Sequence, residues 1–172
     1  MIRWPVFWLL WLGGLAALMV LIFTNSALVT TASPGGILDH QAAGSAARVN
    51  AIQLAWADAG KSVVARWSMI GDLLFITLYS IGGIIGGRLI WRDGFAPRLK
   101  KLALIAILVF ALFGLADYTE TLAQLAQLLQ GEGSDFLSAL AALARPAKML
   151  FFVAATLLLI LILIWRAIER RA

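Results

Sequence analysis

Gly114-Leu115-Ala116-Asp117-Tyr118-Thr119-Glu120 is the stretch on which the interpretation of this chain depends. It follows an apolar run that begins after Lys101, and it introduces two carboxylates before that run is long enough to cross a bilayer. A charged group in hydrocarbon costs several kcal/mol, so an acid at this depth is paired, hydrated, protonated or functional. Asp117 and Glu120 are therefore the starting point for both the fold and the site.

The composition is that of an integral membrane protein, because 62 % of residues are hydrophobic and only 13 % are charged, against about 25 % charged in soluble domains. We predict one all-α membrane domain, residues 1–172, folded as an antiparallel four-helix bundle. Its spans lie at about 5–23, 70–90, 102–120 and 148–165, with outer loops at 24–68 and 121–147. The third span is long enough only if its helix continues beyond Asp117 to Gln130, which we assume.

The charge distribution predicts the orientation of the spans. The net charge of +5 would fit nucleic-acid binding, but the charges lie at the ends of the apolar segments, so we expect no nucleic-acid partner. One side carries Arg3, Arg88, Arg92, Arg98, Lys100, Lys101, Arg166, Arg170 and Arg171 against only Asp93 and Glu169. Basic residues mark the cytoplasmic side, so we expect both termini there, in the inner (plasma) membrane. Trp4, Trp91 and Trp165 adjoin these arginines, as an interfacial aromatic belt requires.

The first apolar segment resembles a secretory signal in beginning after Arg3 and in being followed by the small residues Thr30 to Ser33. Its core is longer than the 7–15 residues usual in a signal, so we predict an uncleaved helix, with cleavage as the alternative. Gly13 and Gly14 in this segment permit close approach of a neighbouring helix.

Two outer segments are predicted to be amphipathic helices that cover the bundle. In the first, Gln41 to Ala59, apolar residues recur at helical spacing, and the pattern continues past Gly60; its members are Val49, Ile52, Trp56, Val63 and Trp67. In the second, Ser134 is the expected N-cap of a helix from Asp135 to Ala144, after which Pro146 opens the fourth span.

The second span contains two overlapping pairs of glycines at a spacing of four, Gly82 with Gly86 and Gly83 with Gly87. Small residues at this spacing let helices pack closely in membranes. A phosphate-binding loop is excluded, because no strand precedes the glycines and no Lys-Ser/Thr follows them. The partner of this glycine face is either another span of the chain, a second copy in a homodimer, or another membrane protein.

Charged residues from three spans are predicted to share one depth. Asp72 precedes Arg88 by sixteen residues, Asp117 follows Lys101 by sixteen, and Lys148 precedes Arg166 by eighteen. At ~1.5 Å per residue, all three lie roughly 24–27 Å across a core of ~30 Å. Glu120 is one helical turn from Asp117 and on the same face.

Phe75 and Tyr79 lie on the same helical stripe as Asp72, which also runs on to the glycines and so should face the bundle interior. The predicted ligand-binding set is therefore Asp72, Phe75, Tyr79, Asp117, Glu120 and Lys148. In one interpretation the acids only pair with Lys148 or Arg66, or reach water. In the other, their surplus acceptor capacity binds a cation, an amine or hydroxyl headgroup, or a proton.

A metal or cofactor is not expected. The chain has no cysteine, and its single histidine, His40, lies in the turn-rich loop, where we expect it to be solvated.

The preferred function is the binding of a lipid-like or small polar ligand near the outer leaflet, or an accessory role in a membrane complex. The alternative is an intramembrane enzyme acting on a lipid or isoprenoid, with Asp117 or Glu120 as acid/base, Asp72 as charge partner, and Tyr79 or Lys148 orienting the substrate. Ion or proton transport is disfavoured, because below Tyr79 the second span offers only Ser80 and glycines as a path.

Asp72, Phe75 and Tyr79, followed by Asp117-x-x-Glu120 and a basic residue opening the last span, form a pattern that resembles small uncharacterised bacterial four-helix membrane proteins. The resemblance covers roughly residues 51–151 and implies a four-span architecture. Those proteins often place Asn after the Glu, whereas this chain has Thr121. The resemblance implies no activity.

Overall fold

The computed structural model describes residues 3–94 and 96–169, so Phe95 of the expected inner turn, and Arg170 and Arg171 of the expected basic side, lie outside the described residues. The elements are α1 (Trp4–Thr24), a 3-10 helix η1 (Asn25–Leu28), α2 (Ile37–Gln41), α3 (Ala46–Asp58), α4 (Ser62–Asp93), α5 (Pro97–Gln130) and α6 (Asp135–Glu169). No strand occurs in these two described ranges.

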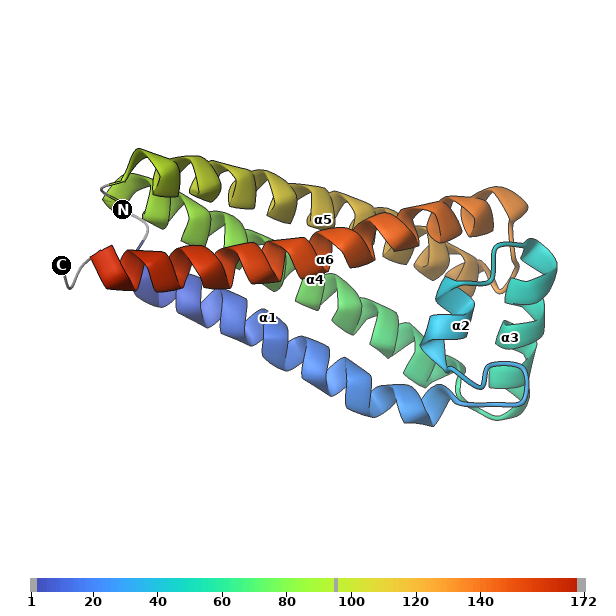
Figure 1. Cartoon of the computed structure of the whole chain (residues 1–172). Coiled ribbons are helices and arrows are strands. Elements are labelled where there is room, and N and C mark those ends of the chain that lie inside the picture. Colours follow the sequence, from blue (N-terminus) through green and yellow to red (C-terminus); the bar gives the residue numbers. More distant parts are fainter. Residues whose placement is uncertain (1–2, 95, 170–172) are drawn as a thin grey trace.

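Four helical segments are long and apolar enough to cross a membrane, as expected of a multi-pass membrane protein: Trp4–Leu28, Ser62–Asp93, Pro97–Gln130 and Asp135–Glu169. α1 packs along α4, α4 along α5, and α5 along α6. In Figure 1 the beginning of α1 and the end of α6 lie at one end of the molecule, and α2 and α3 lie at the other, which we call the α2–α3 end.

The helix ends follow from the local sequence. α5 begins at Pro97, whose missing N–H is not needed in the first turn. It ends at Gly131, which adopts a left-handed conformation with φ of 71° and donates its N–H to the carbonyl of Gln127. Ser134 accepts a hydrogen bond from the Leu137 N–H at 3.4 Å, so the predicted cap before α6 is present.

The long helices extend further than the apolar runs. α5 continues without a break past Asp117 to Gln130, as assumed, and at ~1.5 Å per residue is roughly 50 Å long. α4 begins at Ser62, eight residues before the expected start of the second span, because the helix forms as soon as the turn at Gly60 ends. The loops between the spans are correspondingly shorter than the sequence predicted.

The separate outer helix predicted at Asp135 to Ala144 is wrong, because α6 runs through Pro146 as one helix. An interior proline removes one intrahelical hydrogen bond and crowds the preceding turn. Here the turns before Pro146 contact α2 and α3, and α6 packs against α5, so tertiary contacts hold the helix together on both sides of the proline.

The predicted apolar face of residues 41–67 is correct only up to Gly60. Val49, Ile52 and Trp56 of α3 are buried, whereas Val63 and Trp67 of α4 are 62 % and 67 % exposed. Gly60 has φ of 68°, a left-handed turn that starts α4 in a new direction and breaks the periodicity. The exposed pair is available to lipid or solvent.

α3 is attached to the rest of the α2–α3 end by specific hydrogen bonds. The Trp56 indole N–H donates to the Leu28 carbonyl at 2.8 Å, which fixes α3 to η1. Asn50 Oδ1 accepts from the Gly133 N–H at 2.6 Å, and Asp135 Oδ1 accepts from the Ala46 N–H at 2.7 Å. α3 is thereby tied to the short turn between α5 and α6.

The four glycines of the two predicted pairs in α4 are covered by helices of the same chain. A β-carbon on Gly82 would lie 2.6 Å from the Trp11 backbone nitrogen of α1, and one on Gly86 would lie 2.6 Å from the Phe7 ring. Gly83 and Gly87 face α5, where the nearest side chains are those of Phe110 and Ile107. Of the partners considered for the glycine face, the structure uses other spans of the chain.

Candidate functional site

Lys148 of α6 lies between two acids of α5. Its Nζ is 2.9 Å from Asp117 Oδ1 and 2.9 Å from Glu120 Oε2. The side chains are buried, with 11 % of Lys148, 3 % of Asp117 and none of Glu120 exposed. Asp117 and Glu120 are three residues apart, so both point to the same side of α5, where α6 packs.

Asp72 of α4 joins this group through Thr121. The Thr121 hydroxyl donates to Asp72 Oδ2 at 2.7 Å, linking α4 to α5 beside Glu120. Asp72 also interacts electrostatically with Lys148, and its side chain is only partly buried. The structure therefore brings together the three charged residues that the sequence placed at one depth and Glu120, which the sequence placed one turn from Asp117. We call Asp72, Asp117, Glu120 and Lys148 the charged cluster.

The charged cluster has more acceptors than donors. With every group ionised, three carboxylates face one ammonium group. Glu120 Oε1 is buried and has no hydrogen-bond partner among the described residues. An unsatisfied buried carboxylate oxygen is costly, so this side of the cluster is suited to accept a proton or a hydrogen-bond donor from a ligand.

Phe75 and Tyr79 lie beside the cluster but do not contribute polar contacts to it. The Thr156 hydroxyl donates to the Phe152 carbonyl, so the Tyr79 hydroxyl donates to Thr156 Oγ1. Tyr79 is thus satisfied by α6. Its ring and that of Phe75 pack with Phe113 and Phe152 at centroid distances of 5.2–6.2 Å. These rings separate the charged cluster from the end of the bundle where α1 begins.

A polar stripe leads from the cluster to the α2–α3 end, and sequence reasoning placed Thr121 on the face of Asp117 but missed Gln124 and Gln127. Thr121, Gln124 and Gln127 of α5 are all buried. Gln124 Nε2 donates to the His40 carbonyl at 3.5 Å, and Gln127 Oε1 accepts from Ser134 N at 2.8 Å and from Ser138 Oγ at 2.9 Å. The spacing of these residues continues the face of Asp117 and Glu120, and this periodicity is the signal that would have found them.

Within residues 3–94 and 96–169, no group of three or more His, Cys, Asp or Glu side chains is arranged to hold a metal ion. The carboxylates and the ammonium group of the charged cluster can form hydrogen bonds, pair charges and bind protons.

His40, expected to be solvated, is instead 1 % exposed. α2 folds under α3, where the imidazole stacks on Trp56 at 5.3 Å and Gln53 Nε2 lies 3.2 Å from His40 Nε2. An amide nitrogen can only donate, so Nε2 accepts and the imidazole is neutral. Burial lowers the pKa of His40 from 6.5 to about 4, opposed in part by a hydrogen bond with Gln124.

Because the pKa of His40 is lowered, we expect the α2–α3 end to become less stable as the pH falls. Between pH 6.5 and 4 the unfolded chain binds a proton at His40 and the folded chain does not, so stability falls as pH falls through this range. The loss should reach about 3 kcal/mol by pH 4. Hydrogen exchange of α2 and α3 measured against pH would detect it.

The matched variant is His40→Gln, which cannot take up this proton. Its exchange profile should be flatter than that of the wild type between pH 6.5 and 4, although contacts with Trp56 are lost at every pH. Parallel profiles for the two proteins would mean that His40 does not titrate in this range.

Comparison with models of protein families, with curated proteins and with solved structures finds no match to this chain.

Proposed function

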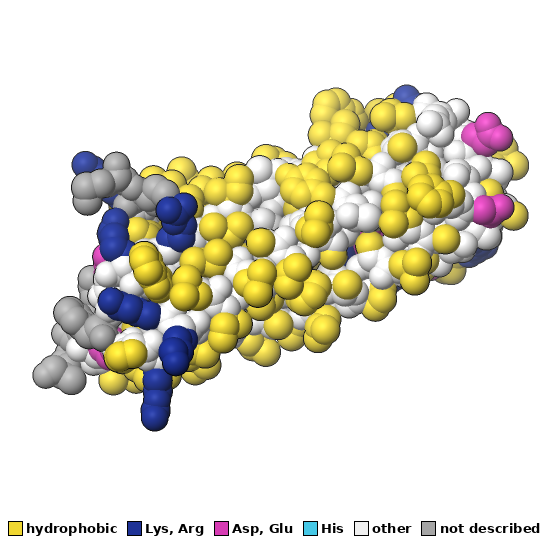
Figure 2. Space-filling view, turned by 90° about the horizontal axis from the view of Figure 1, so that it is seen from above, with side chains coloured by type: hydrophobic (Ala, Val, Ile, Leu, Met, Phe, Trp, Pro, Cys, Tyr) yellow, Lys and Arg dark blue, Asp and Glu magenta, His cyan; other side chains and the backbone are white. Residues whose placement is uncertain are grey.

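We propose that this chain is an inner-membrane protein whose four long helices form an antiparallel bundle with both termini on the cytoplasmic side. The proposal is supported by the positive-inside rule, because seven of the twelve described basic residues lie at the end where α1 starts and α6 ends, and only two described acids, Asp93 and Glu169, lie with them. Figure 2 shows Lys and Arg side chains around that end, apolar side chains along the body, and acidic side chains at the other end. α2 and α3 would then face the outer side.

The function we propose is binding of a small polar or lipid-like ligand at the charged cluster. The observation that carries this is the surplus of acceptors: three carboxylates around Lys148, with Glu120 Oε1 buried and unpaired within the described chain. A ligand with an ammonium or hydroxyl headgroup would supply the missing donors. Asp72, the least buried acid, is the point of first contact.

Asp72→Asn and Asp117→Asn test this proposal. Each replacement removes one charge with almost no change of shape. The amide introduced by Asp72→Asn would still offer an oxygen to the Thr121 hydroxyl, so the bundle should insert and fold. Hydrogen bonds to charged groups contribute about 1.5–3 kcal/mol, so retention of the ligand should fall about ten- to hundredfold. The measurement is quantitative mass spectrometry of lipids and small molecules that co-purify with the full-length protein.

Asp58→Asn is the matched control, because Asp58 is an exposed acid at the end of α3 and not a member of the charged cluster. It should retain the ligand like the wild type. Equal retention in all four proteins would contradict binding at the cluster. Conversion of an added lipid to a new product would replace simple binding by the enzymatic alternative, with Asp117 or Glu120 as the acid/base.

A further inference from the structure

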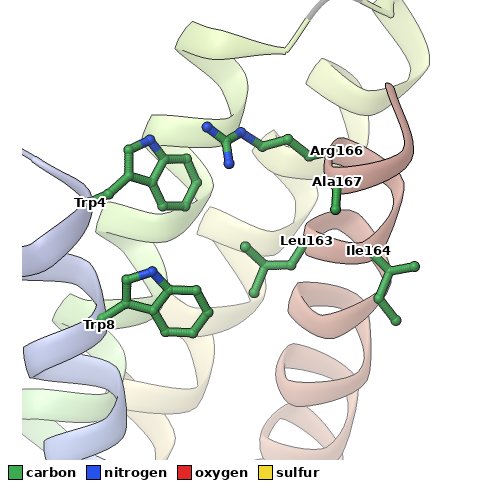
Figure 3. Close-up of a pocket in the computed structure, with 6 residues that line it drawn as sticks. All are labelled: Trp4, Trp8, Leu163, Ile164, Arg166 and Ala167. Atoms are coloured by element: carbon green, nitrogen blue, oxygen red, sulfur yellow. The ribbon is translucent and has the colours of Figure 1, made fainter. Parts of the chain in front are cut away.

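A hollow lies at the opposite end of the bundle from α2 and α3, between the first turns of α1 and the last turns of α6. It has a volume of about 460 Å³ and is lined by Trp4, Trp8, Leu163, Ile164, Arg166 and Ala167. We call it the interfacial hollow (Figure 3). A space of this size is within the range of ligand sites. The charged cluster contributes none of these residues.

The hollow is apolar along its walls and cationic at its edge. Trp8 is 41 % exposed and Ile164 is 54 % exposed, so both present apolar surface. Arg166 extends from α6 towards the ring of Trp4, and its guanidinium carbon is 3.7 Å from the ring centroid (Figure 3). The arrangement places a cation above an apolar wall that descends along α1 and α6.

Asp93 holds the cationic edge in place. It accepts a hydrogen bond from the Trp4 indole at 3.1 Å and from Arg92 Nε at 2.7 Å, and its Oδ2 is 3.8 Å from Arg166. The end of α4 therefore links the start of α1 to the end of α6. Because Trp4 and Arg166 are both fixed by Asp93, the hollow is preorganised, which lowers the entropic cost of filling it.

The surroundings carry a surplus of positive charge. Exposed basic residues at the same ends of the helices are Arg3, Arg88, Arg92, Arg98 and Lys101. Among the described residues, this end of the molecule carries only two acids, Asp93 and Glu169, so the basic residues outnumber them. Tryptophan and arginine are typical of the depth at which lipid headgroups meet acyl chains, and basic pockets between membrane helices bind anionic lipid headgroups.

We propose that the interfacial hollow binds one phospholipid with an anionic headgroup. The phosphate lies at Arg166 beside Trp4, and the upper part of an acyl chain lies against Trp8, Leu163 and Ile164. The anionic lipid is preferred over a zwitterionic one because Arg166 at the edge of the hollow attracts its net charge, whereas the apolar wall alone would accept either.

The test is native mass spectrometry of the full-length protein with phosphatidylglycerol or phosphatidylcholine. The wild type should bind phosphatidylglycerol at least about fivefold more tightly than phosphatidylcholine, since the attraction of one basic residue for an anionic headgroup is worth about that factor and Arg166 is the basic residue that lines the hollow. Arg166→Gln should abolish most of this preference. Ile164→Trp, which fills the hollow and leaves the Arg166 contacts in place, should weaken the binding of both lipids, and it keeps the test decisive if Arg166→Gln does not fold.

Arg98→Gln is the matched control, because it removes the same charge at the same end without lining the hollow. It should keep the lipid preference. Equal affinity for the two lipids in the wild type, an equal loss of preference in Arg98→Gln and Arg166→Gln, or unchanged binding in Ile164→Trp would each overturn the proposal. Displacement of the lipid by millimolar inorganic phosphate would also overturn it, because the site would then recognise phosphate alone.

Discussion

Replacing Lys148 by methionine should destabilise the protein by about 3–5 kcal/mol, the largest effect expected of any single substitution here. Lys148 is the cation that faces Asp117 and Glu120 at 2.9 Å, with Asp72 nearby, and methionine preserves most of its volume while removing the charge. The three acids would then face one another in a buried site without a counter-charge. Unfolding by SDS in mixed micelles measures the loss.

Two further variants distinguish the loss of charge from the loss of packing in Lys148→Met. Lys101→Met removes a lysine that is exposed at the start of α5 and should change stability by less than about 0.5 kcal/mol. Adding Asp117→Asn and Glu120→Gln to Lys148→Met removes the uncompensated acids, so the triple variant should regain much of the lost stability. If Lys148→Met alone is as stable as Lys101→Met, the charged cluster does not hold the helices together.

Gly14→Ala should destabilise the bundle by about 1–3 kcal/mol through overpacking between α1 and α4. A β-carbon at Gly14 would lie 2.7 Å from the Tyr79 backbone nitrogen, and backbone atoms of a packed helix cannot move aside without separating the two helices. Gly82→Ala is the reciprocal change on α4, where the β-carbon would meet the Trp11 backbone at 2.6 Å. Both should lower the temperature of unfolding.

Gly13→Ala is the matched control on the neighbouring residue. There the new β-carbon would be 3.9 Å from Leu78 Cδ1, an ordinary contact, so only the gain in helix propensity remains. Gly13→Ala should therefore be neutral or stabilising by up to about 1 kcal/mol. Similar effects at Gly13 and Gly14 would show that α1 and α4 do not pack as closely as the structure has them.

The coincidence of depth among Asp72, Asp117 and Lys148 could be predicted because it depends only on the helical rise and on basic residues that mark one membrane boundary. The hydrogen-bond and ion-pair partners of these residues could not be predicted from the sequence. Lys148 pairs with Asp117 and Glu120, whereas Asp72 accepts a hydrogen bond from Thr121, which the sequence placed on the same face as Asp117 but did not pair with Asp72. Which of several acids meets one lysine depends on the rotation of each helix about its axis, and packing against neighbours sets that rotation.

The glycines of α4 illustrate the same division. Their spacing predicts a close-packing face, but the division of that face between α1 on one side and α5 on the other depends on the positions of three helices at once. The burial of His40 was missed for a related reason. A polar residue in a turn-rich segment is usually solvated, and here the segment folds beneath α3 because Trp56 and Gln53 offer it stacking and a hydrogen bond.

Hydropathy, charge asymmetry and helical period were thus enough to predict the helical class of the protein, its four long apolar helices and the common level of its buried charges along them, since each is a property of one segment and its solvent. The pairing of charges, the continuity of α6 through Pro146 and the interfacial hollow arise only when the helices pack together. They depend on contacts between residues far apart in the chain, whose energies no local pattern encodes.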